Sequence, residues 1–325
     1  MMQELNYKLA VAPMLHRTDR WFRYCVRMLT KHTVLYTEML TVNTLLHTDP
    51  QPFLFFDPIE LPLVLQLGGN DPKTLAHCAK LAESWGYSAV NLNVGCPSDR
   101  AQAGGFGACL MLQPELVAEC VATMQATVTI PITVKHRIGI DHQDSYAALA
   151  HFIELVSQAG CKTFIIHARK AWLSGLSPRE NRQVPALDYA MVYAIKQNFP
   201  ALKIIINGGI KDLQAASSHL SSVDGVMIGR AAYDNPWLLA QADSYIFDKP
   251  AFDLTRQELI QRLIPWIQQE VSKGIPITRI TKHLLGLFYG QPGGRLWRRC
   301  LSENAYMSGG DPAILQDCYA ACSLK

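Results

Sequence analysis

Short apolar runs recur along the first two thirds of the chain, and most are near-continuous stretches of Val, Ile, Leu and Thr. Such runs are typical of parallel strands, because helices cover a parallel sheet on both faces. We therefore predict eight strands. They lie at residues 7–14, 33–39, 62–69, 89–97, 132–140, 162–168, 203–209 and 225–230.

Helical patterns separate most of these runs. The clearest, Pro72–Trp85, begins with Asp71 as a cap and a first-turn proline, both of which favour a helix start. Strand–helix alternation indicates a parallel sheet, and eight strands can close into a (β/α)8 TIM barrel. The alternative, an open doubly wound sheet, is disfavoured because no GxGxxG turn follows the first run. The other predicted helices are Pro114–Thr127, Asp144–Gln158, Leu187–Asn198 and Asp212–Leu220.

The pattern changes after residue 245. Thr255 and Glu258 have the spacing of a capping box, which marks the start of a helix. Apolar residues then recur at helical spacing, and no run typical of a barrel strand follows. The chain is therefore expected to form a barrel over residues 1–245 and a small helical domain over residues 246–325.

The composition is that of a folded protein with a large core. Hydrophobic residues make up 49% of the 325 residues and charged ones only 18%, which argues against extensive disorder. No apolar run approaches the roughly 20 residues of a membrane span, and we expect no signal peptide. The nine cysteines are dispersed without zinc-like spacing. We expect a cytoplasmic protein with reduced thiols, no metal site and no membrane partner.

The basic charge is concentrated near the end of the chain. Residues 1–245 contain 20 basic and 20 acidic residues, so the net charge of +3 comes from residues 246–325, which contain 10 and 7. Such a cluster is either a solvated basic face or a contact surface for nucleic acid. Five basic residues occur in one segment without an acidic one: Arg279, Lys282, Arg295, Arg298 and Arg299.

Polar side chains stand near the carboxyl ends of several predicted strands, where the active site of a (β/α)8 barrel lies. Gln66, Asn91 and Asn93 would either line that site or complete hydrogen bonds inside the barrel. Lys135 lies in an apolar strand, where an ammonium group is costly unless an anion meets it. It is paired with a carboxylate or holds a ligand's negative charge, and we favour the ligand. His167, on the next strand, is a ligand contact or a core histidine.

Two glycine-rich turns indicate a phosphate site. The loops after strands seven and eight of such barrels commonly hold a phosphate, which backbone N–H groups approach closely at glycines. Ordinary tight turns would explain the glycines but not an arginine directly after an apolar strand, where it can clamp an anion. The residues concerned are Asn207, Gly208, Gly209, Gly229 and Arg230.

Cys96 is the cysteine with the strongest claim to reactivity. It lies at a predicted strand tip between Gly95 and Pro97, and a loop with three glycines follows at residues 103–108. This arrangement predicts a reactive thiol next to a mobile lid. The alternative is an inert thiol beside a flexible surface loop.

These motifs, in this order, resemble those of the tRNA-dihydrouridine synthases, and the resemblance covers essentially the whole chain. The most specific motif is NLNVGCPS at residues 91–98, and APM, QLGG, TVKHRIG, HAR, NGGI and IGRAA accompany it. Residues 167–182 (HARKAWLSGLSPRENR) and the Arg-rich C-terminal stretch are similar to the A subfamily. That subfamily acts on adjacent uridines of the tRNA D-loop, expected to be 20 and 20a.

The resemblance implies FMN as cofactor and NADPH (or NADH) as electron donor. Lys135 would stabilise negative charge near N1 of the reduced flavin, and Gln66 would hydrogen-bond the pyrimidine edge of the ring. The protein's part in such chemistry is to orient the cofactor and tune its electronics. The FMN contacts it implies are Pro13, Met14, Gln66, Lys135 and His167 around the ring and Asn207, Gly208, Gly209, Gly229 and Arg230 around the phosphate.

By the same resemblance, hydride passes to C6 of the uracil and Cys96 donates the proton to C5, so its sulfur must start as a thiol. The base leaves its stack at a cost of a few kcal/mol, which phosphate contacts would offset. The chain would be a monomer, with residues 1–245 as the FMN-binding catalytic barrel and 246–325 as the tRNA-binding domain. The implied tRNA contacts are Asn93, Arg179, Arg182, Arg295 and Arg298.

Three other functions use the same residues. A flavin barrel acting on a small molecule would lack salt-sensitive affinity for tRNA. A phosphosugar enzyme with Lys135 as a Schiff-base amine would be colourless. An RNA-binding barrel without catalytic activity would not respond to loss of Cys96.

Overall fold

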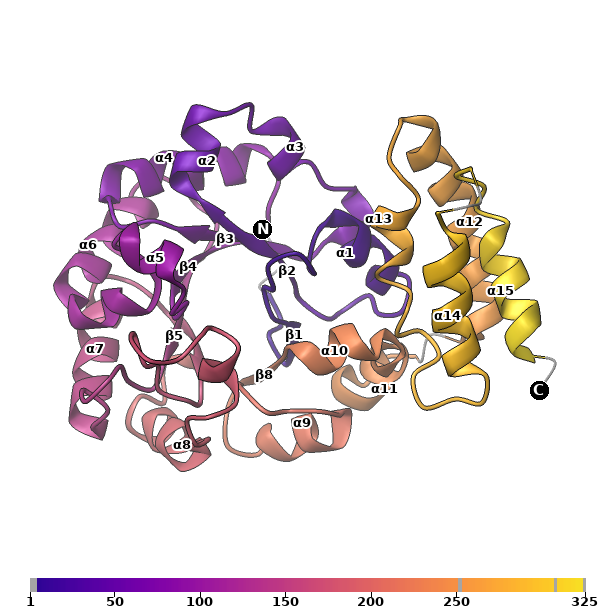
Figure 1. Ribbon diagram of the computed structural model, residues 1–325. Helices are drawn as coiled ribbons and strands as arrows, with labels where there is room; N and C mark the ends of the chain where they lie inside the picture. Colours follow the sequence, from indigo (N-terminus) through magenta and orange to yellow (C-terminus); the bar gives the residue numbers. More distant parts are fainter. Residues whose placement is uncertain (1–4, 251–252, 307–308, 324–325) are drawn as a thin grey trace.

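Eight parallel strands form a barrel in the computed structural model, which describes residues 5–250, 253–306 and 309–323 (Figure 1). Hydrogen-bonded neighbours follow the order β1-β8-β7-β6-β5-β4-β3-β2. The barrel closes where β1 meets the chain before β2: Val11 N donates to Val34 O at 2.9 Å and Val34 N donates to Leu9 O at 3.0 Å. The predicted fold class is therefore confirmed. The strands are β1 Leu9–Val11, β2 Leu35–Thr41, β3 Leu63–Gly68, β4 Ala89–Val94, β5 Ile132–Arg137, β6 Thr163–His167, β7 Lys203–Asn207 and β8 Gly225–Ile228.

Helices follow the strands and cover the outside of the barrel (Figure 1). Each of the five predicted helices is present within two residues of its expected start. The 3-10 helices are η1 Pro58–Glu60, η2 Gly107–Leu112, η3 Glu180–Arg182 and η4 Pro236–Gln241. The α-helices up to residue 247 are α1 Arg20–Arg27, α2 Val42–His47, α3 Gln51–Leu54, α4 Pro72–Ser84, α5 Asp99–Ala103, α6 Pro114–Gln125, α7 Tyr146–Gln158, α8 Tyr189–Asn198, α9 Leu213–His219, α10 Arg230–Asp234 and α11 Ala242–Phe247.

Seven of the eight predicted strands are longer than the observed ones, and the first and the fifth show the physical reason. The first ends at Val11, because β8 pairs with only three of its residues and Pro13 has no N–H to continue the ladder. The fifth ends at Arg137, because Ile140 leaves the sheet and bridges to Gln143 and Ala171. Apolar residues continue past the last ladder hydrogen bond in both cases, so the pattern alone overextends the strands.

The barrel interior is a packed core of small and large side chains. Ala10, Tyr36, Val64, Ile165 and Met227 are fully buried there and belong to one cluster. A larger cluster fills the space between the strands and the surrounding helices. The interior is therefore filled by side chains and is not an open pore, so a ligand must bind at the carboxyl ends of the strands, where the candidate site lies.

Helices alone follow the last strand among the described residues, and they pack beside the barrel near α1 (Figure 1). The predicted capping box is present, with Thr255 N donating to Glu258 Oε2 at 2.8 Å. Trp21 Nε1 donates to Glu270 Oε2 at 3.0 Å and so connects α1 with this part. Within the described residues, no helix has both the length and the apolar character to cross a membrane. The C-terminal helices are α12 Arg256–Ser272, α13 Thr278–Thr281, α14 Gly294–Asn304 and α15 Ile314–Ser323.

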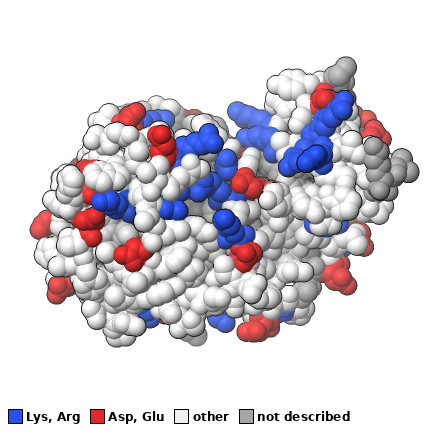
Figure 2. All heavy atoms as spheres, turned by 60° about the horizontal axis from the view of Figure 1, so that its bottom comes forward, with Lys and Arg blue, Asp and Glu red and all other residues white. Residues whose placement is uncertain are grey.

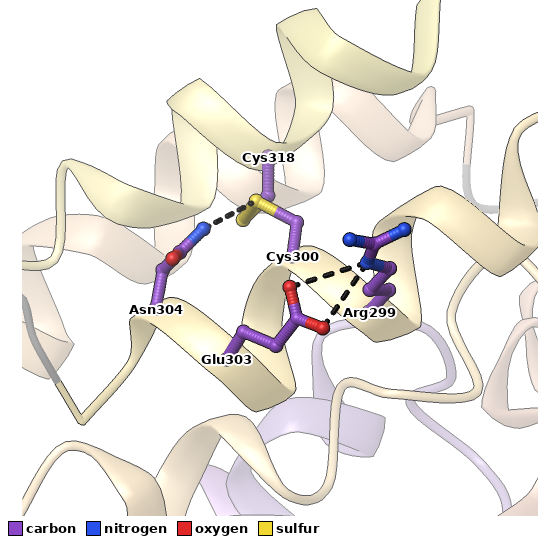
Figure 3. Close-up of a disulfide and its surroundings, with 5 residues drawn as sticks. All are labelled: Arg299, Cys300, Glu303, Asn304 and Cys318. Atoms are coloured by element: carbon purple, nitrogen blue, oxygen red, sulfur yellow. Dashed lines mark hydrogen bonds and ion pairs between the residues drawn. A yellow bond between two sulfur atoms is a disulfide. The ribbon is translucent and has the colours of Figure 1, made fainter.

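A disulfide joins α14 to α15, between Cys300 and Cys318 (Figure 3). The expectation that all nine cysteines are reduced is therefore wrong for these two. The physical reason is tertiary: two helices pack side by side and bring two residues together that are 18 apart in sequence. The division of labour between residues 1–245 and 246–325 stays a prediction.

Reduction of the Cys300–Cys318 bond should destabilise the α14–α15 pair. In the chain-entropy model, closing a loop of this length contributes about 3 kcal/mol. We expect a reductant to lower the Tm of the wild type by several degrees and to leave a Cys300→Ala/Cys318→Ala variant unaffected. Equal melting of the wild type in both conditions, with all cysteines titrating as free thiols, would contradict the bond.

Candidate active site

A ladder of hydrogen-bonded side chains crosses β3, β4 and β5 inside the barrel. The strand register pairs Gln66 with Asn91 and Asn91 with Thr133. Gln66 Nε2 donates to Asn91 Oδ1 at 2.7 Å, and Asn91 Nδ2 donates to Thr133 Oγ1 at 2.9 Å. Asn93 Nδ2 donates to Gln66 Oε1 at 2.8 Å. Asn91 thus has the interior structural role that was left open for it, whereas the role of Gln66 at a flavin stays a prediction.

Asn93 also shapes the turn that carries Cys96. Its Oδ1 accepts hydrogen bonds from Gly95 N at 3.0 Å and Cys96 N at 2.9 Å. The carbonyl of Cys96 accepts a hydrogen bond from Ala108 N at 2.8 Å. The glycine-containing loop at residues 103–108 therefore packs against this turn. The half-buried Cys96 thiol lies 3.3 Å from Ser98 Oγ. The thiol is therefore held at a fixed place at the end of β4.

Gly107 allows this close packing. Its φ is +79°, and a Cβ added there would lie 2.5 Å from the Cys96 carbonyl oxygen. A side chain at this position would therefore push the loop away from Cys96. Whether the loop also moves as a lid stays a prediction.

Lys135 has a cationic side chain with no ion pair among the described residues. Its Nζ donates to Asn207 Oδ1 at 3.1 Å, and Asn207 Nδ2 donates to the Met227 carbonyl at 2.7 Å. Burial, reinforced by the nearby charge of Arg137, lowers the pKa of Lys135 to about 7. Of the two alternatives for Lys135, a carboxylate partner is absent among the described residues, and an anionic ligand, the favoured alternative, would stabilise the charged amine.

His167 lies in a strongly cationic environment. Burial lowers its pKa well below the usual range, and the charges of Arg137 and Lys135 lower it further, so the ring is neutral. Arg169 and Arg182 act on it in the same direction. Its Nδ1 is buried and has no hydrogen-bond partner. An anionic ligand would balance the charges of these cations, and a polar atom on a ring of that ligand could hydrogen-bond the free Nδ1 of His167.

Arg137 organises the site, although the sequence analysis gave it no role. Its Nε donates to the Gly95 carbonyl at 2.9 Å, and its Nη1 donates to the carbonyls of Lys170 and Asn181, both at 3.0 Å. Arg137 therefore ties the Cys96 turn to the segment after β6. Burial lowers its pKa to about 10. The only feature of the sequence that indicated this role is the position of Arg137 at the end of an apolar strand.

The two glycine turns lie next to each other, because β7 and β8 pair in the sheet. Gly208 and Gly209 have φ values of +120° and +72°. The positive φ of Gly209 disfavours any side chain there, and an added Cβ would lie 2.5 Å from Leu187 Cδ1, so that the leucine would have to move. Gly229 precedes α10 and has more open space, with Ala12 Cβ 3.7 Å from a Cβ built there.

Arginines surround these turns. Arg230 is exposed and donates a hydrogen bond to the Arg182 carbonyl at 3.2 Å. Burial lowers the pKa of Arg182, and the charges of the neighbouring Arg230, Arg17 and Arg179 lower it further. Arg179 is also exposed. Figure 2 shows Lys and Arg gathered around a hollow on one face of the molecule. The structure thus brings two predicted RNA contacts, Arg179 and Arg182, close to the predicted phosphate clamp.

The remaining predicted residues lie in two places. Pro13 and Met14 are half-buried in the turn after β1, which is closed by a 3.0 Å hydrogen bond from Met14 N to Thr18 Oγ1. Arg295 and Arg298 are exposed on α14, outside the barrel. An RNA that contacts Arg179 and Arg182 at the barrel rim as well as these two arginines on α14 must therefore span the barrel and the C-terminal helices.

Together, the fold and the site define a (β/α)8 barrel whose strand ends present a thiol and an unpaired cationic site suited to a phosphate-bearing cofactor. The family model for dihydrouridine synthase (Dus) matches residues 10–322. The chain is 55% identical, over 95% of its length and 92% of the relative, to the tRNA-dihydrouridine(20/20a) synthase of Synechocystis sp.. Its identity to the proteins of the same name from Salmonella typhi and Escherichia coli O6:H1 is 55% and 54%, over 95% of this chain and 93% and 94% of those relatives.

The chain therefore belongs to the dihydrouridine synthase family. The resemblance found in the motifs, including the likeness to the A subfamily, is confirmed. Members of this family are flavin-dependent oxidoreductases, so the chain is an enzyme of that class and the phosphosugar alternative is wrong.

The lowered pKa of Lys135 makes stability depend on pH in the cofactor-free protein. Between about pH 7 and its ordinary value of 10.5, the unfolded chain binds a proton at Lys135 that the folded chain lacks. The free energy of unfolding should thus rise with pH in this window, by up to about 1.4 kcal/mol per pH unit from this group.

Urea unfolding of the wild type and a Lys135→Met variant at several pH values measures this contribution. The variant should be more stable than the wild type near pH 7, and the difference should shrink as the pH rises toward 10. A difference that stays constant over this range would show that Lys135 keeps an ordinary pKa.

Proposed function

We propose that this enzyme reduces the C5–C6 double bond of uridines 20 and 20a in the tRNA D-loop, with FMN as cofactor and NADPH as electron donor. The observation that carries the proposal is the half-buried Cys96 thiol, fixed at the tip of β4 within electrostatic reach of Lys135. The names of the relatives, which share about half of their residues with this chain, supply the substrate.

The residues at the strand ends fit FMN. Lys135 would meet negative charge on the ring system, which removes the cost of a cation without an ion pair. The orphan Nδ1 of His167 would gain a polar partner, and Gly208, Gly209 and Arg230 would surround the phosphate. When bound, FMN supplies the hydride that adds to C6 of the uracil.

Cys96 supplies the proton. Addition of hydride at C6 must be matched by a proton at C5, and a positioned thiol can deliver it as general acid. Asn93 fixes the backbone of Cys96 from one side, and Arg137 fixes the adjacent Gly95 carbonyl from the other.

The RNA must present an unstacked uridine at the barrel mouth, and this costs a few kcal/mol. Contacts of tRNA phosphates with Arg179 and Arg182 at the rim, and with Arg295 and Arg298 on α14, would offset the cost. Asn93 would contact the flipped base. Residues 246–325 would thus be the RNA-binding part of a monomeric enzyme that acts on cytoplasmic tRNA.

Replacement of Cys96 by alanine tests the proton donor. Cys96→Ala should retain FMN, because no predicted flavin contact changes, and should form dihydrouridine about 100-fold more slowly or worse. Mass spectrometry of digested tRNA measures the product, and the flavin absorbance measures the cofactor. Normal product yield from Cys96→Ala would remove Cys96 from the reaction.

Replacement of the α14 arginines tests the RNA-binding role. Arg295→Ala/Arg298→Ala should weaken tRNA binding and lower the slope of log affinity against log salt by about one to two units, because two phosphate contacts are lost. The matched control is Arg299→Ala, since Arg299 already pairs with Glu303 at 3.1 Å. If the double variant binds tRNA as the wild type does, the RNA lies elsewhere.

A further inference from the structure

A groove outside the barrel lies between α13 and α14. Its volume is about 420 Å³, within the range of about 300–1,000 Å³ typical of ligand sites. Leu285, Leu301 and Ala305 form an apolar floor. Neither the proton donor nor the predicted flavin contacts lie in it, so the reduction chemistry does not account for it.

The rim of the groove is polar and cationic. Arg279 and Lys282 contribute positive charge, Thr278 and Ser302 contribute hydroxyl groups, and the described lining includes no acidic residue. Lys282 is partly neutralised, because its Nζ lies 3.1 Å from Asp19 Oδ2. Arg279 forms no ion pair with any described residue. The anion-binding capacity of the groove therefore rests mainly on Arg279.

An aromatic side chain stands at the edge of this groove. Tyr306 is 84% exposed, although burial of such a ring would be favourable, and it lines the groove next to the apolar floor. Exposed aromatic rings beside cations are the usual platform for single-stranded nucleic acid, because every base can stack on them. An acidic peptide without apolar or aromatic side chains would use the cations but neither the ring nor the apolar floor.

The groove continues a row of cations along α14. Arg295 and Arg298 lie about two turns and one turn before Ser302, so helical spacing places all three on one side of the helix. Arg299 points its charge at Glu303 instead (Figure 3). Figure 2 shows blue side chains on the C-terminal helices on the same face as those around the central hollow. An RNA strand bound along this row would reach the groove.

We propose that this groove binds one unstacked nucleotide of the tRNA substrate, other than the uridine that is reduced. The base would lie on the apolar floor against Tyr306, and its phosphate would meet Arg279. Single-stranded loops of RNA offer such splayed bases. This inference rests on the proposed function, and it adds a second anchor that sets how the RNA lies on the barrel.

The test measures tRNA affinity of the flavin-loaded enzyme at several salt concentrations. Tyr306→Ala should weaken binding about tenfold at every salt concentration, because stacking is lost and the number of phosphate contacts is not. Arg279→Ala should weaken binding at low salt and lower the salt slope by about one. Tyr306→Phe should bind as the wild type does, because it keeps the ring.

Two variants control for general effects. Tyr289 is also exposed, at 56%, but does not line the groove, and Arg262 is an exposed arginine on α12 outside it. Tyr289→Ala and Arg262→Ala should bind tRNA as the wild type does. Circular dichroism of each variant shows whether it is folded, and Tyr306→Phe tests the same position without loss of the ring.

Wild-type affinity for Tyr306→Ala, or an equal loss for Tyr289→Ala, would overturn the groove assignment. If the wild type still forms dihydrouridine in that case, the proposed function stands and only the groove is wrong. If the wild type neither binds tRNA nor forms product, both proposals fall.

Discussion

The hydrogen-bonded ladder of Gln66, Asn91 and Asn93 is the interaction on which the site depends. These amides are buried or nearly so, and a buried polar group without a partner is costly, so the register of β3, β4 and β5 must bring them together. A slip of one residue would turn the amides to the other face of the sheet. Once the ladder is formed, the oxygen of Asn93 is directed at the turn that carries Cys96. The position of the proposed proton donor is therefore a consequence of strand pairing.

The cations above this ladder explain why the barrel mouth suits an anionic cofactor. Lys135 and Arg137 are held by neutral oxygen atoms, a side-chain amide and backbone carbonyls, and neither forms an ion pair within the described residues. Partly desolvated charges of one sign repel each other, which costs stability in the protein alone. Burial, reinforced by these charges, lowers the pKa of His167 and keeps its ring neutral. The arrangement of these residues therefore lowers the stability of the cofactor-free protein, and binding of an anion would offset that loss.

Much of the fold and part of the site could be predicted from the sequence, because both follow from local pattern. Buried parallel strands read as apolar runs, and a barrel places its site at their carboxyl ends, so Cys96 and Lys135 could be singled out without coordinates. The role of Arg137 could not, because its partners are backbone carbonyls of two loops whose path no spacing reveals. The Cys300–Cys318 bond also depends on the packing of two helices. The groove beside Tyr306 is likewise a product of tertiary packing.

The most direct test of the central claim is anaerobic. The flavin-loaded enzyme is reduced with NADPH, excess donor is removed, and the flavin absorbance is followed after addition of tRNA that lacks dihydrouridine. We expect the oxidised spectrum to return only when tRNA is present, with one dihydrouridine formed for each flavin reoxidised. A flavin that accepts electrons from NADPH but stays reduced in the presence of this tRNA would contradict tRNA as the substrate.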